Sequence, residues 1–250
     1  MLQGQKIVVV MPAYNAARTL RQTYDEVMAH GIVDRVILVD DGSKDETAAL
    51  ARALPQVQVE VHPQNRGYGG NQKTCYRLAL AAGADIVIMI HPDYQYDSRL
   101  TPYLIGFLKE GFLDVMLGSR IRTRKEALSG GMPLYKYLAN RTLTFIENIL
   151  LGMNLSEWHT GFRAYTRKVL ETIPWHDNSD DFVFDSQVLV QCVSFGFRIG
   201  EIPIPVRYHD TSSSINFRRS MKYGILTIVT ALRFVLHRLH IVRSRLFAEP

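Results

Sequence analysis

Short apolar runs alternate with segments of helical periodicity along the first half of the chain. Five runs are rich in β-branched and aliphatic residues and have the length of buried strands: residues 7–11, 35–40, 57–62, 85–90 and 114–119. Between these runs, apolar spacing predicts helices over residues 16–30, from residue 45, over 71–82 and over 100–109. Strands that alternate with helices at this spacing form βαβ units. We therefore predict an α/β fold, with a mainly parallel sheet covered by helices on both faces.

The second half of the chain has a different rhythm. Residues 122–131 have the composition of a loop, and residues 132–151 predict a long helix. A short loop, NLSEWHTGFR, precedes further helix and the strand-like segment EIPIPVRY. Residues 217–247 have helical periodicity and contain seven basic residues and no acid. We predict one catalytic domain over residues 1–216 and a basic amphipathic helical tail over residues 217–250.

Composition narrows the class of protein. The chain has 250 residues, of which 47% are hydrophobic and 21% are charged, so it can bury a sizeable core and is not expected to be disordered. Cys75 and Cys192 lie far apart in apolar helical patterns, which favours buried thiols over a disulfide or a zinc site. No uncharged apolar run approaches the roughly 18 residues of a membrane span, and the first residues do not resemble a signal peptide. We expect a cytoplasmic protein.

The charge balance favours an anionic partner. Lys and Arg number 29 and Asp and Glu number 24, which gives a net charge of +5 and an isoelectric point near 9.2. The chain has no motif of the common nucleic-acid-binding folds, and its basic residues gather in the tail. We therefore expect an anionic small molecule or a lipid headgroup rather than nucleic acid.

Polar residues follow the fourth strand, where an open α/β sheet binds its ligands. This segment, HPDYQYD, places His91, Asp93 and Gln95 at the mouth of the expected crevice. The oxygen ligands suit a hard divalent ion that shares the phosphates of a substrate, and the imidazole favours manganese over magnesium. The alternative is a solvated turn with a helix cap at Asp97.

Two further segments follow earlier strands. Asp40 and Asp41 end the second strand, and one of them is expected to face a ligand, while Asp45 caps the next helix. Gly67 and Gly69 lie in NRGYGGN before a helix, where glycine lets the backbone approach phosphates. The sequence is neither the dinucleotide fingerprint nor a P-loop. The neighbouring arginine, Arg66, is either an anion ligand or a solvated residue.

The candidate acids and bases lie in the second half. Glu157 and Asp185 could each act as a general base, and His159 has the more suitable ordinary pKa. Asp185 is also well placed to cap a helix. Arg120 and Arg163 could each meet an anionic oxygen.

Taken together, these motifs resemble those of the inverting family 2 glycosyltransferases. The resemblance rests on PAYN, VDDGSKDET, NRGYGGN, HPDYQYD, GSR and TGFRAY, which occur in the family's order between about residues 6 and 236. The nearest branch is the polyprenyl-phosphate sugar synthases. The resemblance implies the GT-A fold, a divalent metal cofactor (Mn or Mg) and a nucleotide-diphosphate-sugar donor.

The resemblance also implies roles for individual residues. Pro12, Tyr14, Val39 and Asp41 would hold the donor base and ribose, beside the loop that contains Arg66, Gly67 and Gly69. Asp93 stands at the second aspartate of the Asp-x-Asp motif, and Gln95 matches a further position near the metal. Glu157 falls where the family commonly has an acid, and Arg120 and Arg163 match positions that face phosphates or acceptor.

Two positions depart from the family pattern. His91 replaces the first aspartate of Asp-x-Asp, which puts the metal's identity in question. Near the end, SSSINFRR replaces a Gly-x-Ser-Lys signature, with Ile215 about where lysine is expected. Arg218 or Arg219 is the candidate to supply the missing charge.

Our leading hypothesis is transfer of a hexose from a nucleotide sugar to a polyprenyl phosphate, with UDP-glucose favoured over GDP-mannose. The alternatives are transfer to a saccharide or protein hydroxyl, and a non-catalytic nucleotide-binding module. Ile225, Ile228, Leu232, Val235, Leu239 and Val242 form an apolar stripe on the basic tail. This stripe either lies in a membrane interface or packs against the catalytic domain or a second subunit of a homodimer.

Overall fold

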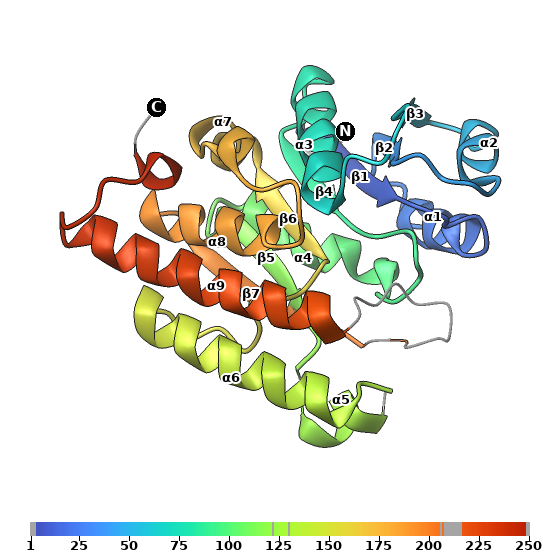
Figure 1. Cartoon of the computed structure of the whole chain (residues 1–250). Helices are drawn as coiled ribbons and strands as arrows, with labels where there is room; N and C mark the ends of the chain where they lie inside the picture. The colour runs from blue at the N-terminus through green and yellow to red at the C-terminus, as the bar shows by residue number, and fades with distance from the viewer. Residues whose placement is uncertain (1–3, 122, 130, 206, 208–216, 249–250) are drawn as a thin grey trace.

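A computed structural model describes residues 4–121, 123–129, 131–205, 207 and 217–248 (Figure 1). At its centre is a seven-stranded sheet of order β3-β2-β1-β4-β6-β5-β7. The strands are β1 (Ile7–Ala13), β2 (Arg35–Asp40), β3 (Val57–Val61), β4 (Ile86–Met89), β5 (Val115–Ser119), β6 (Arg163–Thr166) and β7 (Ile199–Pro203). All pairings are parallel except those of β6, which runs antiparallel to both β4 and β5. The prediction of a mainly parallel α/β sheet is confirmed.

Helices cover both faces of the sheet. They are α1 (Leu20–Met28), α2 (Thr47–Arg52), α3 (Tyr68–Ala81), α4 (Thr101–Lys109), α5 (Arg124–Ser129), α6 (Leu134–Leu151), α7 (Arg167–Thr172), α8 (Phe184–Ser194) and α9 (Phe217–Arg238). Alternation along the strands explains the two layers, because neighbouring side chains of one strand point to opposite faces. In β1, Val8 and Val10 pack under α3 and α8, while Ile7 and Val9 pack under α1 and α4.

The second half differs from the sequence prediction in several places. No strand was predicted at β6, because its short run RAYT follows a loop-like segment and has no apolar alternation. A loop was predicted over residues 122–131, but Arg124–Ser129 form the short helix α5, in which Ala127 packs on Met132 and Tyr137. The predicted strand EIPIPVRY begins earlier, at Ile199, and residues 206 and 208 of that segment lie outside the described part of the chain.

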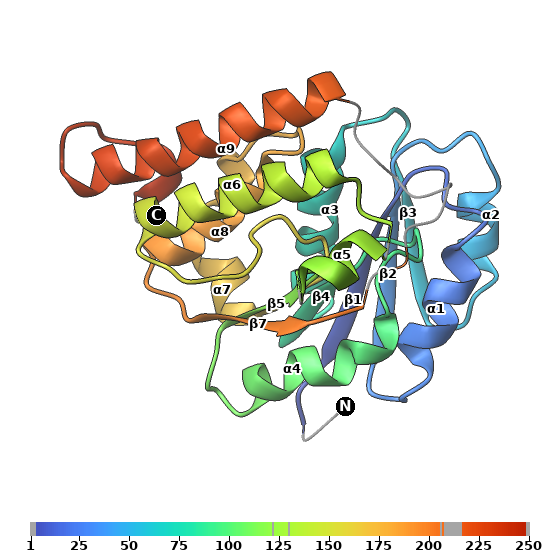
Figure 2. The ribbon, with the colours of Figure 1, turned by 90° about the horizontal axis from the view of Figure 1, so that it is seen from below.

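Helices α6 and α9 form an outer layer, side by side and beyond α8 from the sheet (Figures 1 and 2). The inner face of α9 buries Thr227, Thr230, Ala231 and Phe234. After Arg238 the chain turns, and the 3₁₀ helix Arg245–Phe247 packs Phe247 against Phe234. The helix therefore ends nine residues before the predicted end at residue 247, because this turn returns the chain to the core.

The tail's apolar stripe lies mostly on the solvent side. Ile225, Leu232, Leu239 and Val242 are exposed, whereas Val235 is partly buried against the core. Packing of the whole stripe against the catalytic domain is therefore not what the structure shows. None of the helices within the described residues is long and apolar enough to cross a membrane.

Candidate active site at the carboxyl edge of the sheet

The antiparallel strand β6 brings the TGFR segment to the ligand-binding edge. In the sheet register, Arg163 pairs with Met89 of β4 on one side and with Leu117 of β5 on the other. The start of β6 thus lies beside the ends of β4 and β5. Loops from both halves of the chain meet there, which the sequence pattern of parallel βαβ units did not predict.

Asp41 organises the loop that precedes α3. Its side chain is almost fully buried and accepts hydrogen bonds from the backbone N–H groups of Arg66, at 2.8 Å, and Gly67, at 3.0 Å. The ring of His62 lies 2.7 Å from the same carboxylate. Asp40 is equally buried and binds Ser43. Both acids therefore shape loops, where one had been expected to face a ligand.

The glycines of this loop are explained by close packing of the chain. A Cβ atom on Gly67 would lie 2.6 Å from the carbonyl oxygen of Asp180, and one on Gly69 would overlap Ser179. The N–H of Gly69 donates to the Asp180 carbonyl at 2.8 Å, and Lys73 binds the Asp180 carboxylate. Because these N–H groups already have protein acceptors, direct contact of the glycines with a donor phosphate stays a prediction.

The four remaining donor-binding candidates differ in accessibility. Tyr14 and Arg66 are exposed near the ends of β1 and β3. Pro12 is buried in β1 and pairs in register with Val39. Val39 is fully buried in the core, and its carbonyl accepts a hydrogen bond from Asn71 at 3.0 Å. Its side chain therefore offers no surface to a donor.

His91 is held by a hydrogen-bonded chain that ends at Asp185. The Tyr68 hydroxyl donates to Asp185 Oδ2 at 2.7 Å and lies 2.9 Å from His91 Nε2. Burial and the nearby Asp185 raise the pKa of Tyr68, which keeps its single proton on the hydroxyl. Since that proton goes to Asp185, Nε2 of His91 must be the donor to Tyr68. An uncharged His91 then carries its lone pair on Nδ1.

The predicted metal site has residue types that bind divalent ions, and all three lie in the segment that follows β4. Asp93 is partly exposed, and its Oδ1 accepts a hydrogen bond from the Gln95 backbone at 3.1 Å. A histidine that binds a metal commonly donates its second ring N–H to another side chain, as His91 does to Tyr68. Among the described residues, no group of three His, Cys, Asp or Glu side chains is close enough to hold a metal. Binding of a metal by His91, Asp93 and Gln95 stays a prediction.

Glu157 forms a buried ion pair with Arg120. Its carboxylate accepts hydrogen bonds from the Arg120 backbone at 2.6 Å, from the Arg120 guanidinium Nε at 2.8 Å and from Asn140 at 2.8 Å. Burial alone would raise the pKa of Glu157, but the charge and hydrogen bonds of Arg120 outweigh burial and lower it. Glu157 is therefore a fixed anion that positions Arg120, whose guanidinium also donates to the His159 carbonyl at 2.7 Å.

Arg163 and Asp185 form a second buried pair beneath the edge. Arg163 is fully buried, lies 3.3 Å from Asp185 and donates to the Thr160 carbonyl at 2.6 Å. It was expected to face phosphates or acceptor, and its burial places it beneath that surface. Asp185 was expected to cap α8, but the helix starts before it and the carboxylate accepts from Tyr68 and Gln72.

His159 lies in a buried polar cluster behind Glu157. Its Nδ1 is 2.8 Å from the Tyr223 hydroxyl of α9, and its Nε2 is 3.2 Å from a carboxylate oxygen of Glu147 in α6, without hydrogen-bond geometry. Burial lowers the pKa of His159 to about 3 and raises the pKa of Glu147 to about 8. His159 is therefore a poor general base at neutral pH, contrary to the expectation from its ordinary pKa.

Sequence reasoning missed Tyr68, Lys136 and Gly161. Burial lowers the pKa of Lys136, and the charge of the nearby Arg120 lowers it further. A Cβ atom on Gly161 would lie 2.8 Å from the His91 ring, so glycine at this position lets the TGFR turn pack on His91. The glycine and tyrosine were visible in the quoted motifs, but their partners lie far away in the sequence.

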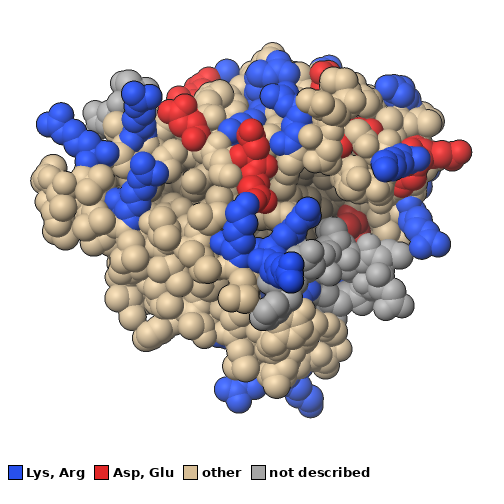
Figure 3. All heavy atoms as spheres, viewed as in Figure 1, with Lys and Arg blue, Asp and Glu red and all other residues tan. Residues whose placement is uncertain are grey.

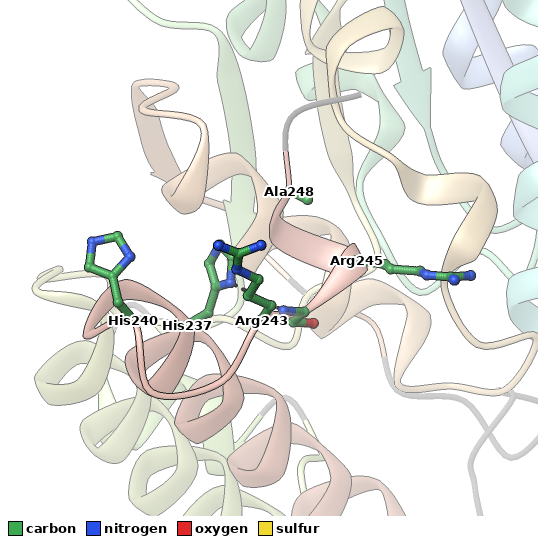
Figure 4. A pocket seen from close by; sticks show the side chains of 6 residues that line it. His237, His240, Arg243, Arg245 and Ala248 are labelled. Carbon is green, nitrogen blue, oxygen red and sulfur yellow. Dashed lines mark hydrogen bonds between the residues drawn. The ribbon is translucent and has the colours of Figure 1, made fainter.

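A hollow of about 580 Å³ lies elsewhere, at the end of α9 (Figure 4). It is lined by His237, His240, Arg243, Ser244, Arg245 and Ala248. None of these residues was among the predicted site residues, and the hollow is at the opposite end of α9 from Phe217. The predicted site residues thus lie at the strand edge and not in this hollow.

The family model for glycosyl transferase family 2 matches residues 8–174 of the chain. This chain belongs to glycosyl transferase family 2. The matched segment contains the Asp41, His91 and Glu157 regions of the candidate site. The resemblance inferred from the motifs is therefore confirmed, and the chain is a glycosyltransferase.

Two archaeal relatives match most of the chain. One is the UDP-N-acetylglucosamine–dolichyl-phosphate N-acetylglucosaminyltransferase of Methanococcus voltae, 28% identical over 82% of this chain and 87% of the relative. The other is the dolichyl-phosphate hexose transferase of Haloferax volcanii, 28% identical over 80% of this chain and 82% of the relative.

Solved structures show the same fold. Glucosyl-3-phosphoglycerate synthase of Mycobacterium tuberculosis with Mn²⁺, uridine diphosphate and glucosyl-3-phosphoglycerate has a TM-score of 0.69 and 22% identity, and the match covers 97% of this chain and 82% of that one. The complex of the same enzyme with uridine diphosphate has a TM-score of 0.71 and 23% identity, and covers 97% and 83%. The predicted GT-A architecture is confirmed.

Proposed function

We propose that the protein transfers a hexose from a nucleoside-diphosphate sugar to a polyprenyl phosphate. The observation that carries this proposal is the Arg120–Glu157 pair, because Glu157 is a buried anion held by its partners and its lowered pKa makes it a weak base toward an acceptor. Asp185 is likewise bound, by Tyr68, Gln72 and Arg163. A hydroxyl acceptor needs a base, whereas a phosphate monoester, with a second pKa of about 6, attacks as an anion.

The names of the two archaeal relatives support a lipid phosphate acceptor. Both relatives act on dolichyl phosphate, and both are matched over most of their own length. A lipid acceptor and a water-soluble donor must meet at a membrane surface. We therefore propose that the enzyme works peripherally, on the cytoplasmic face of a membrane.

The proposed donor is a UDP-hexose, with UDP-glucose as the first candidate and GDP-mannose as the alternative. One relative uses UDP-N-acetylglucosamine, and the synthase of the same fold was solved with uridine diphosphate. Among the predicted donor-binding residues, Tyr14 and Arg66 have exposed side chains that could contact the base, ribose or phosphates. Pro12, Asp41, Gly67 and Gly69 would shape this surface through the backbone.

A divalent metal is proposed at Asp93, with His91 Nδ1 and Gln95 as further ligands. Such an ion neutralises charge that grows on the leaving diphosphate. The Tyr68–Asp185 chain fixes the ring of His91 in the tautomer that a metal ligand requires. The nitrogen donor favours manganese over magnesium.

Arg120 is the proposed electrophilic residue of the site. Glu157 and Asn140 hold its surroundings rigid, so its guanidinium needs no reorganisation as charge develops on a phosphate. Lys136 would add a second positive charge nearby. Arg163 is proposed to support this site from below. Attack from the face opposite the departing diphosphate would invert the anomeric centre.

The test is an acceptor panel assayed with radiolabelled UDP-glucose and manganese. A short, soluble isoprenyl phosphate should be glycosylated, whereas the matching isoprenol and free sugars should not be. Glu157→Gln should lower the rate with the phosphate acceptor and leave the pH profile unchanged. Turnover of a hydroxyl acceptor, with a rising limb of kcat/KM that disappears in Glu157→Gln, would overturn the proposal.

A further inference from the structure

The exposed face of α6 is apolar along its whole length. Leu134, Tyr135, Leu138, Phe145 and Ile149 are each between 53% and 64% exposed. The other exposed positions of the helix, Ala139 and Thr142, are uncharged. The helix has only three charged residues, and all of them are partly or fully turned away: Lys136, Arg141 and Glu147. A solvent-facing helix normally carries charges on this side.

The exposed side of α9 has a row of apolar residues with basic residues beside it, which we call the exposed stripe. It consists of Met221, Ile225, Val229, Leu232, Leu236 and Leu239, each between 38% and 62% exposed. Five exposed cations accompany the exposed stripe, and one of them, Lys222, also pairs with Asp181 at 2.7 Å: Arg218, Arg219, Lys222, Arg233 and Arg238. Helix α9 contains no acidic residue. Its sequence therefore combines an apolar face with exclusively positive charge.

The two faces form one surface. Helices α6 and α9 pack side by side, and at Gly224 an added Cβ atom would lie only 3.5 Å from Leu143 of α6. Figure 3 shows the result as a broad uncharged area over these helices, with Lys and Arg atoms at its edges. Soluble monomers rarely expose a continuous apolar patch of more than a few hundred Å² unless something binds there. We call this surface the α6–α9 face.

Charge decides whether this face suits a second copy of the chain or an anionic bilayer. In a twofold dimer the same patch meets itself, so cations of α9 such as Arg233 and Arg238 would approach those of the other copy. An anionic bilayer accepts the apolar side chains and attracts the same cations. The hollow at the end of α9 adds His237, His240 and Arg243 to this edge, beside the exposed Ile241 and Val242 (Figure 4).

The inner sides of both helices reach the candidate active site. Asn140 of α6 donates to Glu157 at 2.8 Å, and Tyr223 of α9 lies 2.8 Å from the His159 ring. The face and the Arg120–Glu157 pair are thus two sides of one packed layer. An enzyme bound through this face would hold its site at a fixed distance from the lipid.

We propose that the α6–α9 face docks on the surface of an anionic bilayer and delivers the active site to a lipid-borne acceptor. The docking follows from the face itself, and its purpose rests on the proposed lipid acceptor. The apolar side chains would insert between headgroups while the cations of α9 meet lipid phosphates.

The experiment is flotation of the full chain with vesicles of phosphatidylcholine, with or without phosphatidylglycerol. Wild type should float with the anionic vesicles and lose most binding at high salt. Phe145→Glu and Ile225→Glu should each lower the partition coefficient by roughly tenfold or more. Arg233→Gln and Arg238→Gln should each lower it roughly fivefold, on anionic vesicles only.

The matched control is Phe112→Glu, which changes a side chain 66% exposed and outside the two helices. It should bind vesicles as wild type does. Circular dichroism and UDP binding should be unchanged in all variants, because every substituted residue is on the surface. Light scattering tests the alternative occupant, a second copy of the chain. A stable dimer that Phe145→Glu converts to monomer, with no vesicle binding, would overturn the proposal.

Activity assays separate this proposal from the proposed function. With a short, soluble isoprenyl phosphate, Phe145→Glu should be as active as wild type, while its activity on a long-chain acceptor in vesicles should fall in step with binding. Vesicle binding without turnover of either acceptor would leave the docking face standing and reject the proposed acceptor. Turnover of both acceptors without vesicle binding would support the proposed acceptor and reject the docking face.

Discussion

Two buried carboxylates at the same edge of the sheet are stabilised by different kinds of partner. Asp41 binds the N–H groups of Arg66 and Gly67 and the ring of His62. Glu157 binds the guanidinium of Arg120 and the amide of Asn140. Backbone donors carry no net charge, so Asp41 orders a loop. Glu157 pairs with the cation of Arg120 and therefore holds a positive charge at the site.

The comparison extends to the two halves of the chain. The first half builds its edge from regular strand ends, where two backbone N–H groups hold Asp41. At the other part of the edge, Arg163 is fully buried and Arg120 is 15% exposed, and each is paired with a distant acid. Removing one member of such a pair leaves a buried charge without its partner, which costs more than losing a hydrogen bond.

The largest effect is expected at the deepest pair. Arg163→Met should lower the free energy of unfolding by about 3–5 kcal/mol, because Asp185 stays buried without its cation. Asp41→Asn should cost only about 1–3 kcal/mol, since the backbone donors keep an acceptor. Arg21→Ala, in the exposed pair with Asp25, is the control and should cost less than about 1 kcal/mol. Equal denaturant midpoints for Arg163→Met and Asp41→Asn would remove the distinction.

Arg120 is expected to matter most for turnover. Arg120→Ala should lower kcat by a factor on the order of 10² to 10³, the usual loss when one fixed electrophilic donor is removed. Steady-state kinetics with the isoprenyl phosphate acceptor measure this effect. Arg66→Ala, which removes an exposed cation from the loop bound by Asp41, should raise KM for the donor with a smaller loss of kcat. A larger loss of kcat in Arg66→Ala than in Arg120→Ala would reverse the roles assigned to the two arginines.

The buried side chains of Glu147 and His159 predict a free energy of unfolding that falls as the pH rises above neutral. Burial raises the pKa of Glu147 to about 8, above its unfolded value of 4.5, and lowers the pKa of His159 to about 3, below 6.5. Between pH 4.5 and 6.5 the two effects oppose each other. From pH 6.5 to 8 only Glu147 binds an extra proton in the folded state, so the free energy of unfolding should fall by about 2 kcal/mol. Thermal melts of Glu147→Gln should lack this fall.

Glu157 gives the opposite sign at acid pH. Its pKa is lowered in the folded protein, so its pairing contributes stability above the unfolded value near 4.5. This contribution is lost as the pH falls through the folded value. Acid titration of Glu157→Gln should therefore show a shallower loss than wild type. A steeper loss would mean that Glu157 is protonated in the folded protein.

The smallest effect concerns the metal. Calorimetry should show UDP binding about tenfold more tightly with manganese than without it, a difference of about 1.4 kcal/mol. Asp93→Ala should remove the difference, and His91→Asp should increase the use of magnesium relative to manganese. Tyr68→Phe is the sharper test of the hydrogen-bonded chain, because it leaves His91 in place without its partner. Equal UDP affinity with and without metal would reject Asp93 as a ligand.

The local sequence pattern is enough to predict the alternation of strands and helices over the first 119 residues. Strand periodicity is local, since residues such as Val8 and Ile7 reach opposite layers within one short run. It also located the polar loops at the strand ends, and its ordered motifs identified the family. These features depend on neighbours in the chain, so a single sequence contains them.

Long-range packing determines which polar residues face the site and which lie beneath it. Arg163, Asp185 and Glu157 have the residue types of a catalytic centre, but their burial and pairing depend on β6 running antiparallel between β4 and β5. The exposed stripe of α9 likewise depends on which side meets α6 and α8. Both outcomes follow from contacts between residues far apart in the chain, and no local periodicity encodes them.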